Sequence, residues 1–312
     1  MQINQRAFEL IQTLSERAEL LRIQPFPGLA NVWDFGVHAE GGLAAGILLA
    51  RICMADLATI RIFPSDENDW SGATVTVQTD HPVMACMASQ YAGWQISEGS
   101  FFAMGSGPMR AAAKKEKLFD EIPGQESPDV IVGVLETRAT PTTEVISQIA
   151  NACHVASEQV CLAVAPTASQ AGTVQVVARA IETSLHKMHE LGFDLSRVKS
   201  AMGSAPLPPV AKDDLAGIGR TNDAVLYGGR VTLWLRGDDA SLASIVDQIP
   251  SNASNDFGRP FRDIFARYNH DFYQIDPHLF SPARITLINL DTGASFSAGR
   301  VIPEVLAKSF LG

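Results

Sequence analysis

The amino-acid sequence predicts an α/β fold (α+β layers) made of two mixed α/β domains. Two patterns predict it. Short apolar runs typical of buried strands alternate with segments of helical periodicity, and residues 122–128, rich in proline, glycine and acidic residues, interrupt this alternation. Because such interruptions often mark domain boundaries, we expect an N-terminal domain over residues 1–125 and a C-terminal domain over residues 126–312.

The first elements follow from residue spacing. Residues 6–21 have the periodicity of an amphipathic helix, which also distinguishes this N-terminus from a signal peptide. A strand-like stretch at residues 31–37 leads through a glycine-bearing turn to a helix over residues 43–54. Residues 59–63 and 73–79 are expected to be strands, because threonine and valine alternate along the second with a period of two.

The remaining elements before the interruption continue this alternation. Residues 82–88 start a buried helix, and residues 94–104 are strand-like. Pro108 stands where a helix would begin, since proline fits the first helical turn, and residues 109–117 form the helix body.

The alternation restarts after the interruption. Apolar residues 130–135 predict a strand, and residues 143–153 a helix. Beyond residue 207, where two prolines break the chain, we expect a short helix over residues 212–218, one or two strands over 224–235, helices over 241–248 and 260–268, and a final strand over 284–290.

Residues 159–192 are the most informative segment. An apolar strand over residues 160–165 stops at Pro166, and a loop of small residues leads into a helix over residues 173–191. At about 100° per residue, one helix face carries apolar residues and Ser184, whereas the opposite face carries a polar ridge. The ridge consists of Arg179, Glu182, His186 and His189.

Spacing alone leaves two interpretations of Arg179 and Glu182. Residues three apart on a helix usually form a solvated ion pair that contributes a few tenths of a kcal/mol. The alternative is a catalytic pair. His186, Lys187 and His189 fit the last helical turn, where positive charge favours the carbonyl end of the helix dipole.

Composition excludes several classes of function. The net charge of −10 and a single basic cluster around residues 114–117 argue against a nucleic-acid partner. No apolar run approaches the roughly 20 residues of a membrane span, so we expect a cytoplasmic protein. Four scattered cysteines without paired spacing predict reduced core residues and no metal site.

Several short blocks resemble one known family in the same order along the chain. They lie at residues 88–90, 92–96, 102–108, 164–169, 213–215, 221–223, 271–277, 279–280 and 282–283. Together they resemble methenyltetrahydromethanopterin cyclohydrolase. The resemblance implies hydrolysis of the cyclic amidinium of 5,10-methenyltetrahydromethanopterin to the 5-formyl compound in one-carbon metabolism, either formaldehyde oxidation or a methanogenic-type pathway. It also implies a homotrimer, a pterin substrate bound between two domains, and no cofactor or metal.

The resemblance assigns roles to the polar ridge. Glu182 matches the family's catalytic glutamate, which takes a proton from the attacking water and returns it to N10. Arg179 matches the arginine that holds this glutamate.

Other residues are expected to bind the substrate. Thr221, Asn222 and Asp223 offer the donors and acceptors that a pterin edge needs, although such residues more often cap helices or start turns. One aromatic ring among Trp94, Tyr227 and Phe280 is expected to stack on the pterin. Ser106, Gly107 and Ser169 are further expected contacts, with Ser106 and Gly107 in a glycine-rich turn that could equally be a simple tight turn.

Two alternatives remain open. The protein could be another pterin- or folate-dependent one-carbon transferase, which needs a site for a second substrate. It could also be a non-catalytic pterin-binding protein, for which the loss of Glu182 is expected; Glu182 is present.

Overall fold

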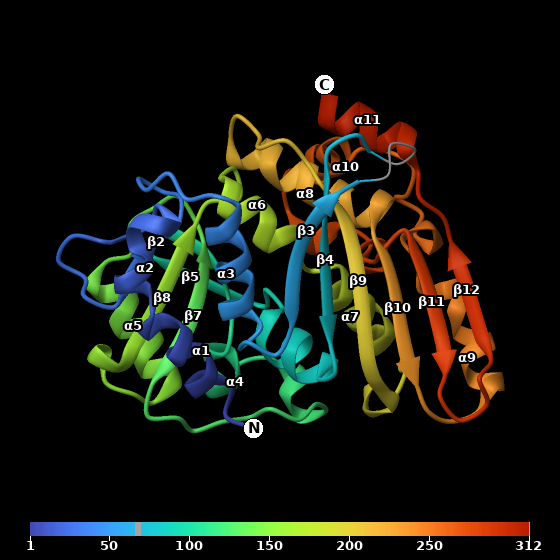
Figure 1. The fold of residues 1–312 in the computed structure, drawn as a ribbon, viewed down its shortest axis with the longest axis horizontal. Helices are drawn as coiled ribbons and strands as arrows, with labels where there is room; N and C mark the ends of the chain where they lie inside the picture. Colours follow the sequence, from blue (N-terminus) through green and yellow to red (C-terminus); the bar gives the residue numbers. More distant parts are fainter. Residues whose placement is uncertain (66–69, 312) are drawn as a thin grey trace. The chain divides into compact units, whose positions relative to one another are not determined.

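The computed structural model describes residues 1–65 and 70–311. The chain divides into two compact units, each with its own mixed sheet of six strands (Figure 1). Unit 1 comprises Met1–Ala58 and Val83–Gln175, and unit 2 comprises Thr59–Pro82 and Val176–Gly312. The α/β class predicted from the sequence is confirmed.

Unit 1 is built on a sheet in the order β1-β2-β8-β7-β6-β5. Its strands are β1 (Gln24–Pro25), β2 (Val32–Asp34), β5 (Trp94–Glu98), β6 (Phe101–Ser106), β7 (Ile131–Glu136) and β8 (Val160–Ala165). The β2–β8 and β8–β7 pairs are parallel, and the other three pairs are antiparallel. The expected single strand over residues 94–104 is instead the hairpin of β5 and β6.

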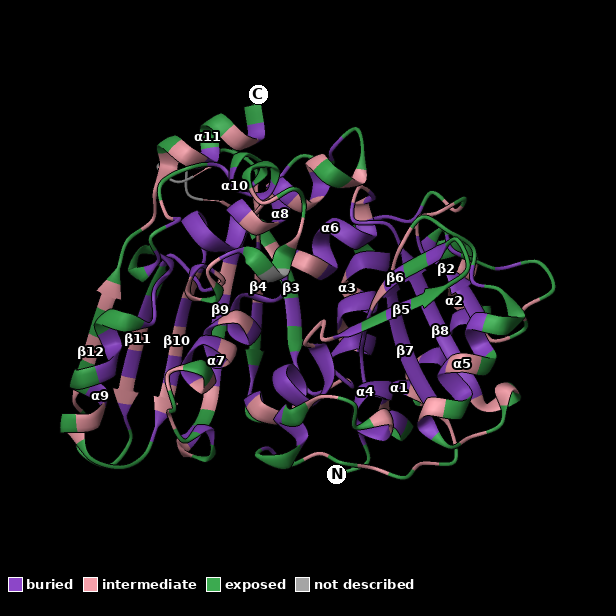
Figure 2. Ribbon diagram, turned by 180° about the vertical axis from the view of Figure 1, so that it is seen from behind, coloured by how far each residue is buried: buried purple, intermediate pink, exposed green. Residues whose placement is uncertain are grey.

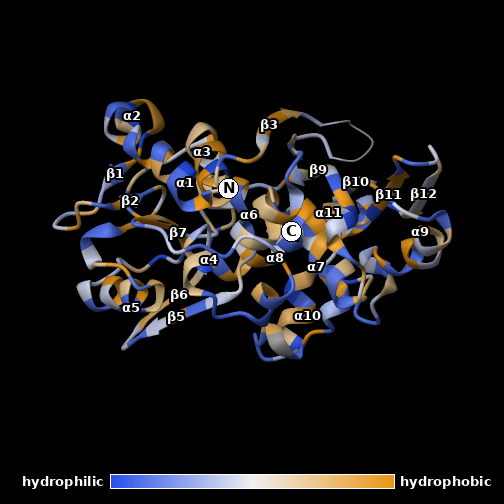
Figure 3. Cartoon of the chain, turned by 90° about the horizontal axis from the view of Figure 1, so that it is seen from below, coloured by the Kyte–Doolittle hydropathy of each residue, from blue (hydrophilic) through white to orange (hydrophobic). Residues whose placement is uncertain are grey.

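Helices cover both faces of this sheet. They are α1 (Ile3–Gln12), α2 (Leu14–Leu21), α3 (Leu43–Cys53), the π-helix η1 (Val83–Gln90), α4 (Met109–Ala113), η2 (Lys117–Asp120), α5 (Thr143–Cys153), η3 (Ser157–Gln159) and α6 (Gln170–Val177). Alternate residues of β7 point to opposite sides, so Val132 and Val134 pack with α1 to α3 while Ile131 and Leu135 pack with α5. Both faces are therefore covered, which explains why β7 and β8 are apolar and buried almost throughout (Figure 2). The helix α3 is apolar along most of its length (Figure 3).

Unit 2 is built on a sheet in the order β12-β11-β10-β9-β4-β3. Its strands are β3 (Thr59–Pro64), β4 (Ala73–Thr79), β9 (Val198–Leu207), β10 (Arg230–Leu235), β11 (Arg284–Asn289) and β12 (Ser295–Gly299). The β10–β11 pair is parallel and the others are antiparallel. The edge strand β12 is exposed at alternate residues, as Figure 2 shows.

The helices of unit 2 are α7 (Ala180–Glu190), η4 (Leu195–Arg197), α8 (Asp214–Gly228), α9 (Asp239–Ile245), η5 (Val246–Gln248), η6 (Ser251–Ala253), α10 (Phe261–Arg267), η7 (Phe272–Gln274), η8 (Pro277–Leu279) and α11 (Pro303–Leu311). Among the described helices, none is both long and apolar enough to cross a membrane.

The structure corrects further predicted elements. The expected helix over residues 6–21 is two helices, α1 and α2, and the expected helix over residues 109–117 ends at Ala113, because Lys114 takes a left-handed conformation. The expected helix over residues 173–191 is two helices, α6 and α7, which meet at Ala178 and Arg179. Residues 224–228 belong to α8 and not to a strand, because the apolar run there is the end of a long helix that is buried on all sides. The strand β9 was not predicted, although it pairs with both β4 and β10.

The two units also divide the chain differently from the expected boundary at residues 125 and 126. The strand β7, which follows that boundary, pairs with β6, which precedes it. Residues 59–82 belong to unit 2 although they lie in the N-terminal part of the sequence, because β4 pairs with β9.

Candidate active site

The helix α7 begins with a buried pair of opposite charges. Arg179 is the N-cap residue, and Glu182 lies in the first turn. Arg179 Nη1 is 3.9 Å from Glu182 Oε2, and the two residues are only 6% and 4% exposed. The solvated surface pair that spacing alone favours is therefore wrong, since water has little access to either group.

The environment of Glu182 favours a negative charge. The first turn of a helix presents N–H groups that its own backbone does not satisfy, and these groups stabilise a carboxylate. Because α6 ends at Val177, this helix start is a new one, and Glu182 lies at the N-terminal end of α7 rather than in the middle of a long helix.

A close contact fixes the start of α7 on the sheet. Gly203 of β9 faces Ile181, and a Cβ atom at position 203 would lie 2.8 Å from Ile181 Cγ1. Such a separation is shorter than carbon–carbon contact allows, so only glycine lets α7 approach β9 this closely. The residue beside Ile181 is Glu182, and its backbone is therefore positioned by this contact.

Thr221 and Asn222 lie within α8 and bond to their own helix. The Thr221 hydroxyl donates to the Gly217 carbonyl at 2.9 Å, and the Asn222 amide donates to the Ile218 carbonyl at 2.9 Å. Neither residue caps a helix or starts a turn, because the N-cap of α8 is Asp213.

Asp223 is the buried acid of α8. Its Oδ1 accepts a hydrogen bond from the Phe261 N–H at 2.7 Å. Burial raises the pKa of the Asp223 carboxyl to about 7, although hydrogen bonds from Ser309 and Phe261 oppose this shift. Asp223 therefore changes its charge near neutral pH.

Phe280 belongs to a cluster of four phenylalanines. Phe261 packs against Phe280 with ring centroids 5.8 Å apart, and Phe272 lies 6.1 Å from Phe280. Phe265 completes the cluster. Since Phe261 also bonds to Asp223, this cluster connects Phe280 to the buried acid. Phe280 itself is only partly buried.

Tyr227, one of the three aromatic candidates, is a core residue. It is fully buried, and its hydroxyl accepts from the N–H groups of Gly258 and Arg259. These contacts fix the chain segment after η6 and leave the ring inside the core.

The candidates in unit 1 are held by their neighbours. The Gly107 N–H donates to the Ser89 carbonyl at 2.8 Å, and the Ser106 hydroxyl lies 3.3 Å from Cys53 Sγ. Ser106 and Gly107 therefore form a closed, buried turn, and the Gly107 N–H does not face an anion.

Trp94 and Ser169 are also integrated into unit 1. Trp94 belongs to the core beneath the sheet, and Lys115 Nζ lies 4.6 Å from its ring centroid. The Ser169 hydroxyl donates to the Pro166 carbonyl at 2.8 Å and accepts from the Gly172 N–H at 3.0 Å. It stabilises the turn that precedes α6.

Two buried cations were not predicted. Arg110 is fully buried, pairs with Glu116 and donates to the carbonyls of Met87 and Ser89, so it holds the end of η1. Its position between Met109 and three alanines is the one sequence signal of its burial. Lys187 is 1% exposed and bonds to a carbonyl far away in sequence, for which no local signal exists.

The predicted residues thus fall into two groups. Unit 1 contains Trp94, Ser106, Gly107 and Ser169, and unit 2 contains Arg179, Glu182, Thr221, Asn222, Asp223 and Phe280. The structure brings Arg179 and Glu182 together, and it links Asp223 to Phe280 through Phe261. Within residues 1–65 and 70–311, no three His, Cys, Asp or Glu side chains are grouped so that they could hold a metal ion.

Comparison with known proteins identifies the family. Residues 2–310 match the family model described as Cyclohydrolase (MCH). A Rhodopirellula baltica protein named methenyltetrahydromethanopterin cyclohydrolase is 49% identical over 90% of this chain and 86% of its own. Proteins of the same name from Methylobacillus flagellatus and Methanosarcina barkeri are 43% and 42% identical, each over 99% of this chain and over 95% and 98% of their own lengths. With a match over nearly its whole length, this chain belongs to the cyclohydrolase (MCH) family.

Proposed function

We propose that this protein hydrolyses the cyclic amidinium of 5,10-methenyltetrahydromethanopterin to 5-formyltetrahydromethanopterin in one-carbon metabolism. The names of its relatives support the substrate, and the buried pair of Arg179 and Glu182 supports the chemistry. This pair is the observation that carries the proposal, because a carboxylate shielded from bulk water beside a fixed cation is suited to proton transfer.

In the proposed reaction, Glu182 acts as the general base. A water oxygen adds to the carbon between N5 and N10 while Glu182 takes one of its protons. As the bond from this carbon to N10 breaks, Glu182 returns the proton to N10 and the added hydroxyl releases its own proton, so a neutral formyl group stays on N5. Arg179 keeps the carboxylate oriented, since its guanidinium lies 3.9 Å from Oε2. The substrate is a cation, so Arg179 repels it. The negative charge of Glu182 offsets this repulsion.

Asp223 and Phe280 are the proposed anchors of the pterin in unit 2. Asp223 supplies a carboxyl that titrates near pH 7, and Phe280, a partly exposed residue, is linked to it through Phe261 of the phenylalanine cluster. Thr221 and Asn222 are proposed as further contacts, through the lone pairs that their intrahelical bonds leave. Trp94, Ser106, Gly107 and Ser169 stay predictions from the family resemblance.

We further propose, from the same resemblance, a homotrimer in the cytoplasm that works without a metal or cofactor in formaldehyde oxidation or a methanogenic-type pathway. Light scattering of the purified protein tests the trimer, and full activity after exhaustive chelation tests the absence of a required metal. No observation favours a transferase or a non-catalytic binding protein.

A spectrophotometric assay tests the proposed function. Purified protein should remove the absorbance of methenyltetrahydromethanopterin and act far more slowly on methenyltetrahydrofolate, because the two pterins differ in ring methylation and in the aryl group at N10. No turnover of the methanopterin compound, or equal rates on both, would contradict the assignment.

A further inference from the structure

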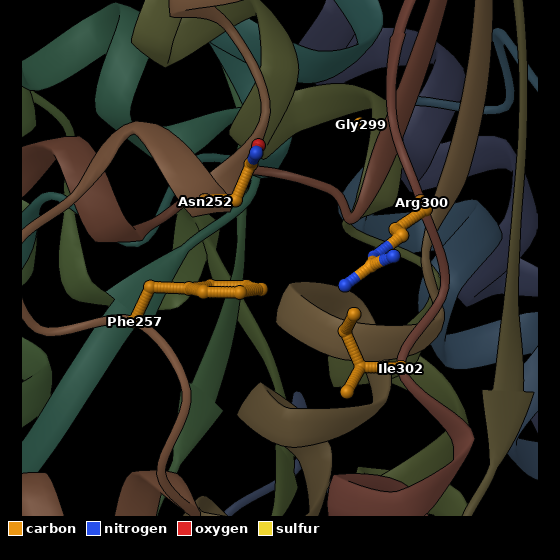
Figure 4. Close-up of a pocket in the computed structure, with 5 residues that line it drawn as sticks. All are labelled: Asn252, Phe257, Gly299, Arg300 and Ile302. Carbon is orange, nitrogen blue, oxygen red and sulfur yellow. The ribbon is translucent and has the colours of Figure 1, made fainter.

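A pocket of about 360 Å³ lies in unit 2 among residues that the proposed reaction does not use. Its lining residues are Asn252, Phe257, Gly299, Arg300 and Ile302 (Figure 4). The volume is within the range of small-molecule sites, about 300–1,000 Å³.

The backbone around the pocket is fixed at three places. The Ile302 N–H donates to the Tyr227 carbonyl at 2.8 Å, and the Ser251 hydroxyl, beside Asn252, donates to the Leu226 carbonyl at 2.5 Å. Gly299 ends β12 with φ +77°, and a Cβ atom there would clash with the Ala283 carbonyl. Only glycine fits this position, so the direction in which the chain enters Arg300 is set by the fold.

The side chains in the pocket combine charge with apolar surface. Figure 4 shows Arg300 and Phe257 reaching into the same space from opposite sides, with Ile302 below the guanidinium. One side of the Phe257 ring is supported by Tyr227, with centroids 5.1 Å apart. Neither Arg300 nor Asn252 makes a side-chain hydrogen bond or ion pair with any described residue. In a chain of net charge −10, an exposed guanidinium with no ion-pair partner among the described residues can bind an anion.

We propose that this pocket binds a small organic anion that carries a planar apolar ring. Arg300 donates to the carboxylate or phosphate of the ligand, and the Asn252 amide supplies a second donor. The ring of the ligand lies against Phe257 and Ile302. The observations behind this site do not rest on the proposed cyclohydrolase activity, so either proposal can fail without the other.

Calorimetric titration of the full chain with phenyl phosphate tests the site. We expect saturable binding, weaker binding of inorganic phosphate, and no binding of benzyl alcohol, which has the ring but not the charge. Arg300→Gln should weaken phenyl phosphate binding at least about tenfold. Phe257→Leu should weaken phenyl phosphate binding and leave phosphate binding unchanged.

Arg236→Gln is the matched control. Arg236 is also exposed, and it lies far from the pocket along the sheet. Gly299 is level with Arg230 at the start of β10, because both residues pair with Arg284. Arg236 follows the other end of β10. This control removes the same charge and should change binding less than twofold. No binding of phenyl phosphate, or equal losses in Arg300→Gln and Arg236→Gln, would overturn the proposal. Thermal unfolding of each variant confirms that it is folded.

Inhibition kinetics distinguish whether the anion bound in the pocket is part of the substrate or a separate compound. If the pocket receives part of the substrate, phenyl phosphate should compete with substrate, and Arg300→Gln should raise KM without lowering kcat. If the ligand is a separate compound, phenyl phosphate should not compete.

Discussion

Lys187 connects the helix of Glu182 to the segment of Phe280 through one hydrogen bond. Lys187 Nζ donates to the His278 carbonyl at 2.6 Å, two residues before Phe280. The lysine is almost fully buried, and burial lowers its pKa to about 8, although Asp276 opposes the shift. Two groups proposed for the same substrate are thus joined by a buried cation.

The first prediction concerns the pH dependence that Lys187 gives to stability. Its folded pKa of about 8 is below its ordinary value of 10.5, because burial disfavours the charged amine. Above about pH 10.5 the lysine is neutral in both the folded and the unfolded state, and folding carries no such penalty. As the pH falls through 8, the folded protein must bury a charged amine and loses stability. The free energy of unfolding of the wild type minus that of Lys187→Met should therefore rise by about 1–3 kcal/mol between pH 7 and 10. Denaturant titrations at several pH values measure it, and a constant difference would show that the lysine does not titrate in this range.

The second prediction concerns Asp223, for which the sign is opposite. Its folded pKa of about 7 is above its ordinary value of 3.8, so its contribution is present below about pH 4 and is lost as the pH rises through 7. Asp223→Asn keeps an acceptor for the Phe261 N–H and removes the titration. Relative to the wild type, this variant should gain about 1–3 kcal/mol in stability between pH 4 and 8. Asp247→Asn, which replaces an exposed acid in η5, is the control and should show little such gain.

The third prediction tests Glu182 as the base. Glu182→Gln keeps the size of the side chain but cannot take a proton, so turnover should fall by about two to four orders of magnitude while substrate still binds. Glu190→Gln, at the exposed end of the same helix, should retain normal turnover. Near-normal turnover in a folded Glu182→Gln protein would refute the proposed mechanism.

The fourth prediction tests the contact that positions α7. Gly203→Ala places a Cβ atom 2.8 Å from Ile181 Cγ1, so α7 must shift and stability should fall by about 1–3 kcal/mol. Turnover should fall as well, because Glu182 moves with the helix. Ile181→Ala removes the clashing atom, so Gly203→Ala should cost less in that background. A double-mutant cycle measures the coupling, and additive losses would mean that the two residues do not press on each other.

The sequence predicted the elements that carry a strong local pattern. The strands β7 and β8 were found because unbroken apolar runs are typical of strands buried on both faces. The strand β9 was missed because its buried positions include Ala201, Gly203 and Ala205, which have low strand propensity, and its strand character comes from pairing with β4 and β10.

In the candidate site, too, the sequence predicted local spacing but not contacts between distant segments. The three-residue spacing of Arg179 and Glu182 correctly predicted that they lie one turn apart, but it could not predict their burial. Burial depends on how closely α7 approaches β9, and therefore on Gly203, which no local pattern connects with Glu182. Likewise, nothing near Asp223 in the sequence indicates that Phe261 is its partner.

The segments of the two units alternate along the sequence, and this alternation sets the order in which their sheets can form during synthesis. The strands β3 and β4 leave the ribosome early, but β4 can pair with β9 only after the whole of unit 1 has been synthesised. At about 5–20 residues per second, this wait is on the order of ten seconds. Throughout it, the β3–β4 hairpin has an unpaired strand edge, while unit 1 can already form its own sheet from completed sequence. The nascent chain is therefore exposed to wrong strand pairing at β4 until residue 207 emerges.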